Sequence, residues 1–138
     1  MKEKTEIKFA SRLESVDEAA AVAARIATER GLPDEALFGI DLAVRETVAN
    51  AVKHGNKFDE GKQVIVTFEG DAQEFVITIE DQGAGFDVGA VPDPTDAENL
   101  LKESGRGILF MRSFMDDVQW KTSASGGTIV RLAKKIDS

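Results

Sequence analysis

The sequence predicts an α+β sandwich in which helices cover one face of a mostly antiparallel mixed sheet. Apolar residues recur with a helical period in two long segments of the N-terminal half. In the segments that follow, apolar and polar residues alternate with the period of a β-strand. A stretch without periodicity at about 87–104, which carries two prolines and several acids, separates the first strands from the last ones.

The N-terminal half is expected to form one strand and two helices. Residues 5–10 alternate enough for a short strand, and a helical pattern covers residues 15–30. Gly31 is a natural C-cap for that helix, and Pro33, followed by two acids, begins the next one. The second helix is predicted to run to about Gly55.

The remaining elements follow from alternation and turn residues. Residues 64–69 and 75–80 alternate as two strands, and residues 69–72 connect them as a hairpin. The non-periodic stretch is long for a compact domain, and such stretches are usually functional lids or disordered segments. A short helix and two strands complete the chain, at about residues 105–114, 118–121 and 128–134.

Length and composition narrow the functional classes. A chain of 138 residues predicts a single domain, 1–138, with a real core. The formal net charge of −8 argues against binding to nucleic acid or to anionic membranes, which would repel it. The absence of cysteine excludes disulfides, thiolate zinc sites and a cysteine nucleophile. No stretch has the apolar length of a membrane span, and a cytoplasmic protein is expected.

The second helix carries the first candidate site. Glu46, Asn50, Lys53 and His54 share one edge, because residues three and four apart are helical neighbours. For an arbitrary helix, a solvated polar face would be the better interpretation of this edge, and His54 alone is more typical of a packed or capping histidine. Zinc is a poor interpretation, since an amide is not a usual zinc ligand and the chain has no second histidine. Magnesium prefers oxygen ligands and few protein groups, so Asn50 could supply one ligand while Glu46 orients or deprotonates a nucleophile.

The second candidate follows the strand at 75–80. Asp81 precedes Gly83, Gly85 and Phe86, a pattern that most often marks only a turn. In the functional interpretation, Asp81 accepts a hydrogen bond from the exocyclic amine of a base. The glycines then let the backbone approach the ring where a Cβ atom would clash. A dinucleotide-binding fingerprint is excluded, because the third glycine is missing and no helix follows.

The third candidate lies where the non-periodic stretch ends. Gly105, Arg106 and Gly107 open the predicted short helix, whose N–H groups and dipole would favour a phosphate. Arg106 adds a cation that can bind phosphate in a bidentate manner. Alternatively, the glycines only permit a sharp turn into the helix. The apolar side chains that follow are interpreted as core residues: Phe110, Met111, Phe114 and Met115.

Taken together, these motifs resemble the GHKL ATPases, the superfamily of gyrase B, MutL, the Hsp90 chaperones and the histidine kinases. The resemblance extends over nearly the whole chain. The matching positions are Glu46 and Asn50 for the N box, Asp81, Gly83 and Gly85 for the first glycine box, Gly105 and Gly107 for the second, and Thr128 for the threonine of the adenine site.

One branch of the superfamily matches best. The larger GHKL machines need a transducer domain, for which 138 residues leave no room. A histidine kinase needs a phosphoacceptor histidine on a dimerisation helix, but the single histidine, His54, lies in the predicted nucleotide-binding helix. The chain is similar to the stand-alone anti-sigma factors that are also serine-protein kinases, of the RsbW and SpoIIAB type. Residues 103–120 resemble that branch especially.

The resemblance implies a Bergerat fold that binds ATP and Mg²⁺ beneath a mobile lid at about 87–104. Asn50 would ligate the magnesium ion, Glu46 would act as the base or as a water-orienting residue, and Asp81 would read the adenine amino group. The glycines of both boxes would make room for the nucleotide, and Arg106 would contact its terminal phosphate. Phe86, Lys53 and His54 are assigned to the same pocket, with the roles of the last two left open.

The resemblance also implies an activity and partners. It indicates an ATP- and Mg²⁺-dependent serine/threonine-protein kinase that phosphorylates an anti-anti-sigma factor of the STAS type and otherwise sequesters a sigma factor. A homodimer is possible, because the strand at 5–10 could be a covered edge or a dimer seam. The alternatives are a nucleotide-gated binding module without phosphotransfer, or a nucleotide-binding domain of a pathway without a sigma factor.

Overall fold

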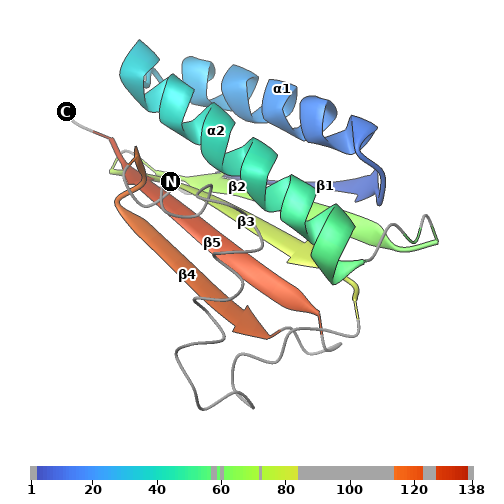
Figure 1. The fold of residues 1–138 in the computed structure, drawn as a ribbon. Coiled ribbons are helices and arrows are strands. Elements are labelled where there is room, and N and C mark those ends of the chain that lie inside the picture. Colours follow the sequence, from blue (N-terminus) through green and yellow to red (C-terminus); the bar gives the residue numbers. More distant parts are fainter. Residues whose placement is uncertain are drawn as a thin grey trace.

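The computed structural model describes residues 3–56, 59, 61–71, 73–83, 114–122 and 127–136. Two helices, a π-helical turn and five strands make up this part of the chain (Figure 1). In chain order they are β1 (Glu3–Ala10), α1 (Glu14–Glu29), α2 (Asp34–Asn50), the π-helical turn η1 (Ala51–Gly55), β2 (Gln63–Gly70), β3 (Glu74–Asp81), β4 (Asp117–Thr122) and β5 (Thr128–Lys135).

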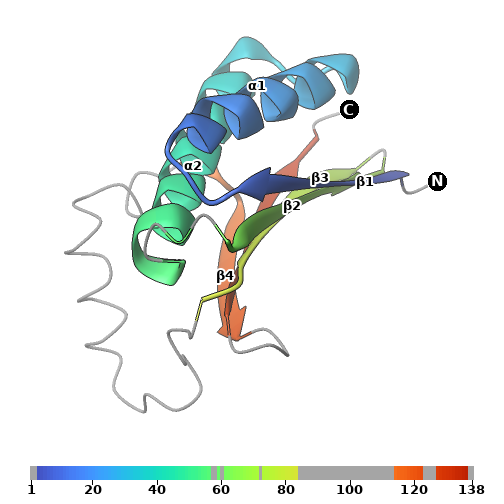
Figure 2. The ribbon, with the colours of Figure 1, turned by 90° about the vertical axis from the view of Figure 1, so that its right-hand side faces the viewer.

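The five strands form one sheet in the order β1-β2-β3-β5-β4, and every pairing in it is antiparallel. Both α1 and α2 lie on the same face of this sheet, as the two views at right angles show (Figures 1 and 2). The predicted α+β sandwich with helices on one face is therefore confirmed, but the sheet of the described strands is wholly antiparallel rather than mixed. The predicted strands and the first helix agree with the observed ones to within about two residues at each end.

The core lies between the helices and the covered face of the sheet. The predicted alternation on β2 and β3 is confirmed, since one side chain in two is buried against the helices: Val64, Val66, Phe68, Phe75, Ile77 and Ile79. Burial of one such side chain contributes about 1.5–3 kcal/mol to folding. Helix α1 presents mainly alanines to this core, and their small size suits close packing against α2.

The second helix differs from the prediction at its C-terminal end. Its α-helical part stops at Asn50, and residues 51–55 form a wider π-helical turn. The backbone N–H of Asn56 closes this turn by donating to the carbonyl oxygen of Ala51, at 2.7 Å. A π turn contains one residue more per hydrogen bond than an α turn, and such turns occur frequently at functional sites.

The chain returns to α2 at Phe114, directly before β4. A Cβ atom on Gly39 would lie 2.5 Å from the Cβ atom of Phe114, so only glycine permits this contact. The Phe114 ring also meets Phe38 edge to face, with centroids 5.5 Å apart, and Met115 is buried in the core. Phe114 and Met115 are thus packing residues, as predicted. Phe110, Met111 and most of the predicted helix at 105–114 lie outside the described residues.

Candidate functional site

The site is built around Asp81, the last residue of β3. Its side chain is buried, and its carboxylate oxygen Oδ1 accepts two backbone hydrogen bonds. Gly83 N–H donates at 3.0 Å and Thr128 N–H at 3.1 Å. The structure therefore brings together three predicted site residues, one of them 47 positions away along the chain.

The electrostatic setting of Asp81 is that of a carboxylate held away from water. Burial raises the pKa of Asp81, and the hydrogen bonds from Thr128 and Gly83 and the charge of Lys62 offset only part of this effect. Both backbone bonds go to the same oxygen, so Oδ2 takes part in neither. A poorly solvated acceptor oxygen of this kind suits a ligand that brings its own N–H donor.

Gly127 allows β5 to begin beside Asp81. A Cβ atom at position 127 would lie 2.1 Å from the backbone carbonyl oxygen of Asp81 and 2.9 Å from its Oδ1. Every residue but glycine would therefore displace one of the two strands. In the sequence, Gly126 and Gly127 indicate only a turn before the last strand. The role of Gly127 is not visible there, because its close contact is to a residue far away in the chain.

The first two of the four residues predicted to share a polar edge, Glu46 and Asn50, lie on α2. Glu46 and Asn50 are both half-buried, and their α-helical spacing places them about 6 Å apart along the axis. Val44 and Val48 of the same helix are fully buried, as expected for the opposite face. The prediction that the edge continues in α-helical spacing to residues 53 and 54 was wrong, because both lie in η1.

Lys53 itself is exposed. The side chain of His54 lies outside the described residues, as do Gly85, Phe86, Gly105, Arg106, Gly107 and the predicted lid. Within the part of the chain that the structure describes, no three histidine, aspartate or glutamate side chains gather where they could hold a metal ion. None of the described helices is long and apolar enough to cross a membrane.

The end of α2 lies close to Asp81. The turn η1 packs on β3, the strand that Asp81 ends. Asn56, the residue after this turn, is buried and accepts a hydrogen bond from the backbone N–H of Gln82, at 2.8 Å. Asn56 was not singled out in the sequence, where an asparagine after a glycine is typical of any turn.

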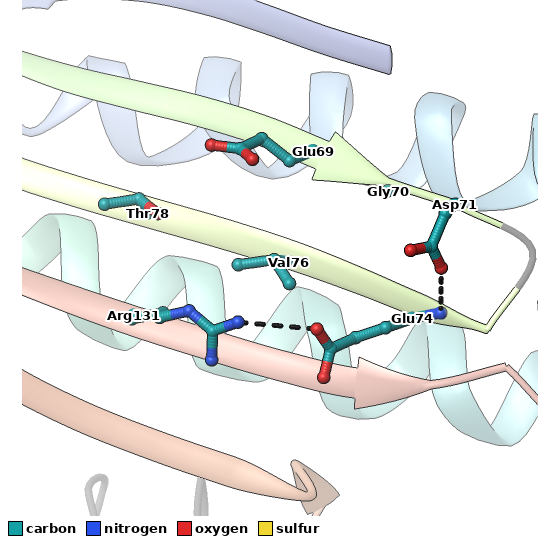
Figure 3. A pocket seen from close by; sticks show the side chains of 7 residues that line it. All are labelled: Glu69, Gly70, Asp71, Glu74, Val76, Thr78 and Arg131. Carbon is teal, nitrogen blue, oxygen red and sulfur yellow. Dashed lines mark hydrogen bonds and ion pairs between the residues drawn. The ribbon is translucent and has the colours of Figure 1, made fainter. Parts of the chain in front are cut away.

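A hollow on the uncovered face of the sheet is a separate feature (Figure 3). It lies near the hairpin between β2 and β3 and is lined by acidic side chains and Arg131. Arg131 pairs with Glu74 at 3.4 Å, and Asp71 accepts a hydrogen bond from the backbone N–H of Glu74 at 3.0 Å. Glu74 and Asp81 are the two ends of β3, roughly 23 Å apart, so the hollow is not part of the candidate site.

Comparison with known proteins identifies the family. A family model described as a histidine kinase-like ATPase domain matches residues 9–134. The chain belongs to this family, the GHKL ATPases. In the solved structure of the RsbU and RsbW domains of Rv1364c from Mycobacterium tuberculosis, a similar fold is found with a TM-score of 0.68 at 17% identity. The match covers 99% of this GHKL chain and 34% of that longer one, and it bears on the fold alone.

Curated relatives of this GHKL domain are named anti-sigma F factors. The protein of that name from Clostridium perfringens (strain SM101 / Type A) is 34% identical over 106 residues, which is 75% of this chain and 76% of the relative. The one from Thermoanaerobacter sp. (strain X514) is 32% identical over 137 residues, with 96% and 94% covered. A third, from Heyndrickxia coagulans, is 33% identical over 140 residues, with 99% and 95% covered.

Proposed function

We propose that this protein is an ATP- and Mg²⁺-dependent serine/threonine-protein kinase that acts as an anti-sigma factor in the cytoplasm. It phosphorylates a serine of an anti-anti-sigma factor of the STAS type and otherwise sequesters a sigma factor. The similarity to anti-sigma F factors over most of the chain supports the regulatory role. The observation that carries the nucleotide-binding role is the buried Asp81 carboxylate, with one oxygen fixed by backbone N–H groups.

The adenine end of the proposed pocket follows from this geometry. Oδ2 of Asp81 accepts a hydrogen bond from the exocyclic amino group of adenine. A buried acceptor favours adenine over a base that lacks this donor, because the acceptor would then be left unpaired. Gly127 lets β5 pack directly against Asp81, and the Gly83 N–H holds Oδ1 of the carboxylate. Thr128 lines the same end, because its N–H already contacts Asp81.

The phosphate end is assigned to α2. The chemistry of its donors fits magnesium, which takes oxygen ligands and is held by few protein groups together with substrate phosphates. Asn50 would offer its amide oxygen to the ion, and Lys53 and His54 follow in η1. When bound, the ion would neutralise charge on the terminal phosphates. The second glycine box with Arg106, together with Gly85 and Phe86, would complete the pocket.

Glu46 would serve as the base for phosphoryl transfer. Its carboxylate accepts the proton of the attacking serine hydroxyl while that oxygen bonds to the terminal phosphorus and the bond to the leaving ADP oxygen breaks. Positioning and charge neutralisation account for most catalysis of this kind, so the protein needs little further chemistry. The presence of both Glu46 and Asn50 favours a kinase over a binding module that only responds to nucleotide.

The experiment has two steps. Calorimetric titration of ATP with and without Mg²⁺ should show magnesium-dependent binding that the Asp81→Asn variant loses. Incubation with ATP labelled at the terminal phosphate should then label an anti-anti-sigma protein encoded near the gene, and a serine-to-alanine variant of that protein should stay unlabelled. Binding without labelling would favour the nucleotide-gated module, whereas a wild-type protein that binds no ATP would overturn the whole proposal.

A further inference from the structure

Asn56 connects three elements through its side chain. Its carboxamide is almost fully buried, with 1% of the residue exposed. Nδ2 donates to the carbonyl oxygen of Gln63, the first residue of β2, at 3.0 Å. Oδ1 accepts from the backbone N–H of Gln82, the residue directly after Asp81, at 2.8 Å.

A third hydrogen bond closes these contacts into a ring. The backbone N–H of Gln63 donates to Oε1 of Gln82 at 2.7 Å. Asn56, Gln63 and Gln82 thus each donate once and accept once within the ring. Reversing the Asn56 amide would set two donors against each other and two acceptors against each other, so the partners fix its orientation.

The position of this ring relates the two ends of the candidate site. On one side, it holds the residue that follows Asp81. On the other side, Asn56 is joined through its own N–H to Ala51, the residue directly after Asn50. The ring is therefore a short hydrogen-bonded connection between the backbone that presents Asp81 and the backbone that presents Asn50.

From this connection we infer that Asn56 is a positioning residue, which sets the distance between the adenine-reading end and the magnesium-binding end of the pocket. The inference rests on the proposed function, because it requires one nucleotide to occupy both ends. A nucleotide with Mg²⁺ has a limited reach from base to phosphate, so both ends engage well only if the protein holds them at the matching separation. Asn56 itself contacts neither end of the nucleotide in this assignment.

The inference predicts a particular pattern of losses in Asn56→Ala. Each end should still bind its own part of the ligand, so the affinity for adenosine should stay within about twofold of wild type, as for independent sites. The gain in ATP affinity that Mg²⁺ gives should fall by about tenfold, because the two ends are no longer held in register. Calorimetry measures the affinities for adenosine, ATP and Mg²⁺-ATP, and the ratio of the last two is the magnesium gain.

Ser15→Ala is the matched control. Ser15 is equally buried, and its hydroxyl donates to the carbonyl oxygen of Ala10, which pairs with Gln63 at the same end of the sheet. The variant loses one buried hydrogen bond of similar kind but leaves the ring intact. A general loss of stability should lower the melting temperature of both variants, whereas only Asn56→Ala should lose the magnesium gain.

A milder variant keeps the test decisive if Asn56→Ala does not fold. Gln82→Ala removes only the bond from Gln63, and both of these residues are exposed, so the fold should persist. Its magnesium gain should fall in the same direction by about two- to threefold. If Asn56→Ala folds and keeps the wild-type magnesium gain, the positioning role is overturned while the proposed function stands. If Asn56→Ala does not fold, a wild-type magnesium gain in Gln82→Ala has the same meaning. Absence of Mg²⁺-ATP binding by the wild type would instead overturn the proposed function and this inference with it.

Discussion

The two ends of the candidate site are built in different ways. At the strand end, the backbone holds Asp81: two N–H groups bind one oxygen, and the side chain is buried. At the helix end, Glu46 and Asn50 are half-buried side chains on the last turns of α2. The strand end is therefore preorganised before any ligand arrives, whereas the helix end presents side chains that are only partly covered by the protein. Substitutions at the strand end should accordingly have the larger effect on nucleotide affinity.

The largest effect is expected from Gly127→Ala. The added Cβ atom would lie 2.1 Å from the carbonyl oxygen of Asp81, so β5 or the end of β3 must move. Overpacking of this kind costs about 1–3 kcal/mol, and it separates Thr128 from the carboxylate. We expect loss of measurable ATP binding and a lower melting temperature. Gly61→Ala, in an exposed turn, is the control. Its added Cβ atom would meet the exposed Asp59 carboxylate at 3.1 Å, and a small shift of that side chain should change neither quantity.

Asp81→Asn should leave the fold intact while changing the base that is accepted. The amide oxygen can still accept from Gly83 and Thr128, but the outward group becomes a donor that faces the adenine amino group. ATP affinity should fall at least about 100-fold, whereas inosine triphosphate, with an acceptor at that position, should gain relative to ATP. Competition binding with both nucleotides measures the ratio. Glu80→Gln is the control for the loss of one negative charge and should leave this ratio unchanged. If the ratio of the two affinities were also unchanged in Asp81→Asn, the assignment of Asp81 would be contradicted.

At the helix end, Asn50→Ala should weaken Mg²⁺-ATP but not magnesium-free ATP. Removal of one proposed oxygen ligand should reduce the magnesium gain by about tenfold or more. Titration of ATP at several Mg²⁺ concentrations gives this gain directly. Equal Mg²⁺-ATP affinity in the variant and the wild type would show that the amide does not ligate the ion.

Glu46→Gln should have the smallest effect on affinity and a large one on turnover. The amide keeps the size of the side chain but cannot accept a proton, so transfer to the protein substrate should slow by about 100-fold or more. ATP affinity should stay near that of the wild type. Glu35→Gln in the first turn of α2 is the control. Wild-type rates in Glu46→Gln would remove this residue from the mechanism.

The raised pKa of Asp81 predicts a modest pH effect on stability. Between the ordinary pKa of an aspartate and the raised one, the folded protein holds a proton that the unfolded chain has released. The contribution of this group to folding is thus fully present below the ordinary value and is lost as the pH rises through the raised value. The melting temperature of the wild type minus that of Asp81→Asn should therefore increase as the pH is lowered. A difference that decreases on acidification would contradict the raised pKa.

The predictable parts of this molecule are those set by neighbours in the chain. Alternation placed the buried side chains of β2 and β3, helical periodicity placed α1 and α2, and Asp81 was expected at the end of a strand, where it lies. The roles of Gly127 and Asn56 could not be found in this way. Gly127 matters because its backbone touches Asp81, and Asn56 because it meets a residue 26 positions away. Contacts across the fold leave no periodic signal.

The π turn after Asn50 has a consequence for how sequences of this type can change in length. Its defining bond, from Asn56 N–H to the Ala51 carbonyl, encloses one residue more than an α-helical bond does. Deletion of a single codon among residues 52–55 would turn this bond into an ordinary α-helical one, with the same donor and acceptor. The ring at Asn56 would survive such a deletion, while the side chains between would rotate. Evolution can therefore vary this short segment in length and still keep the two ends of the site connected.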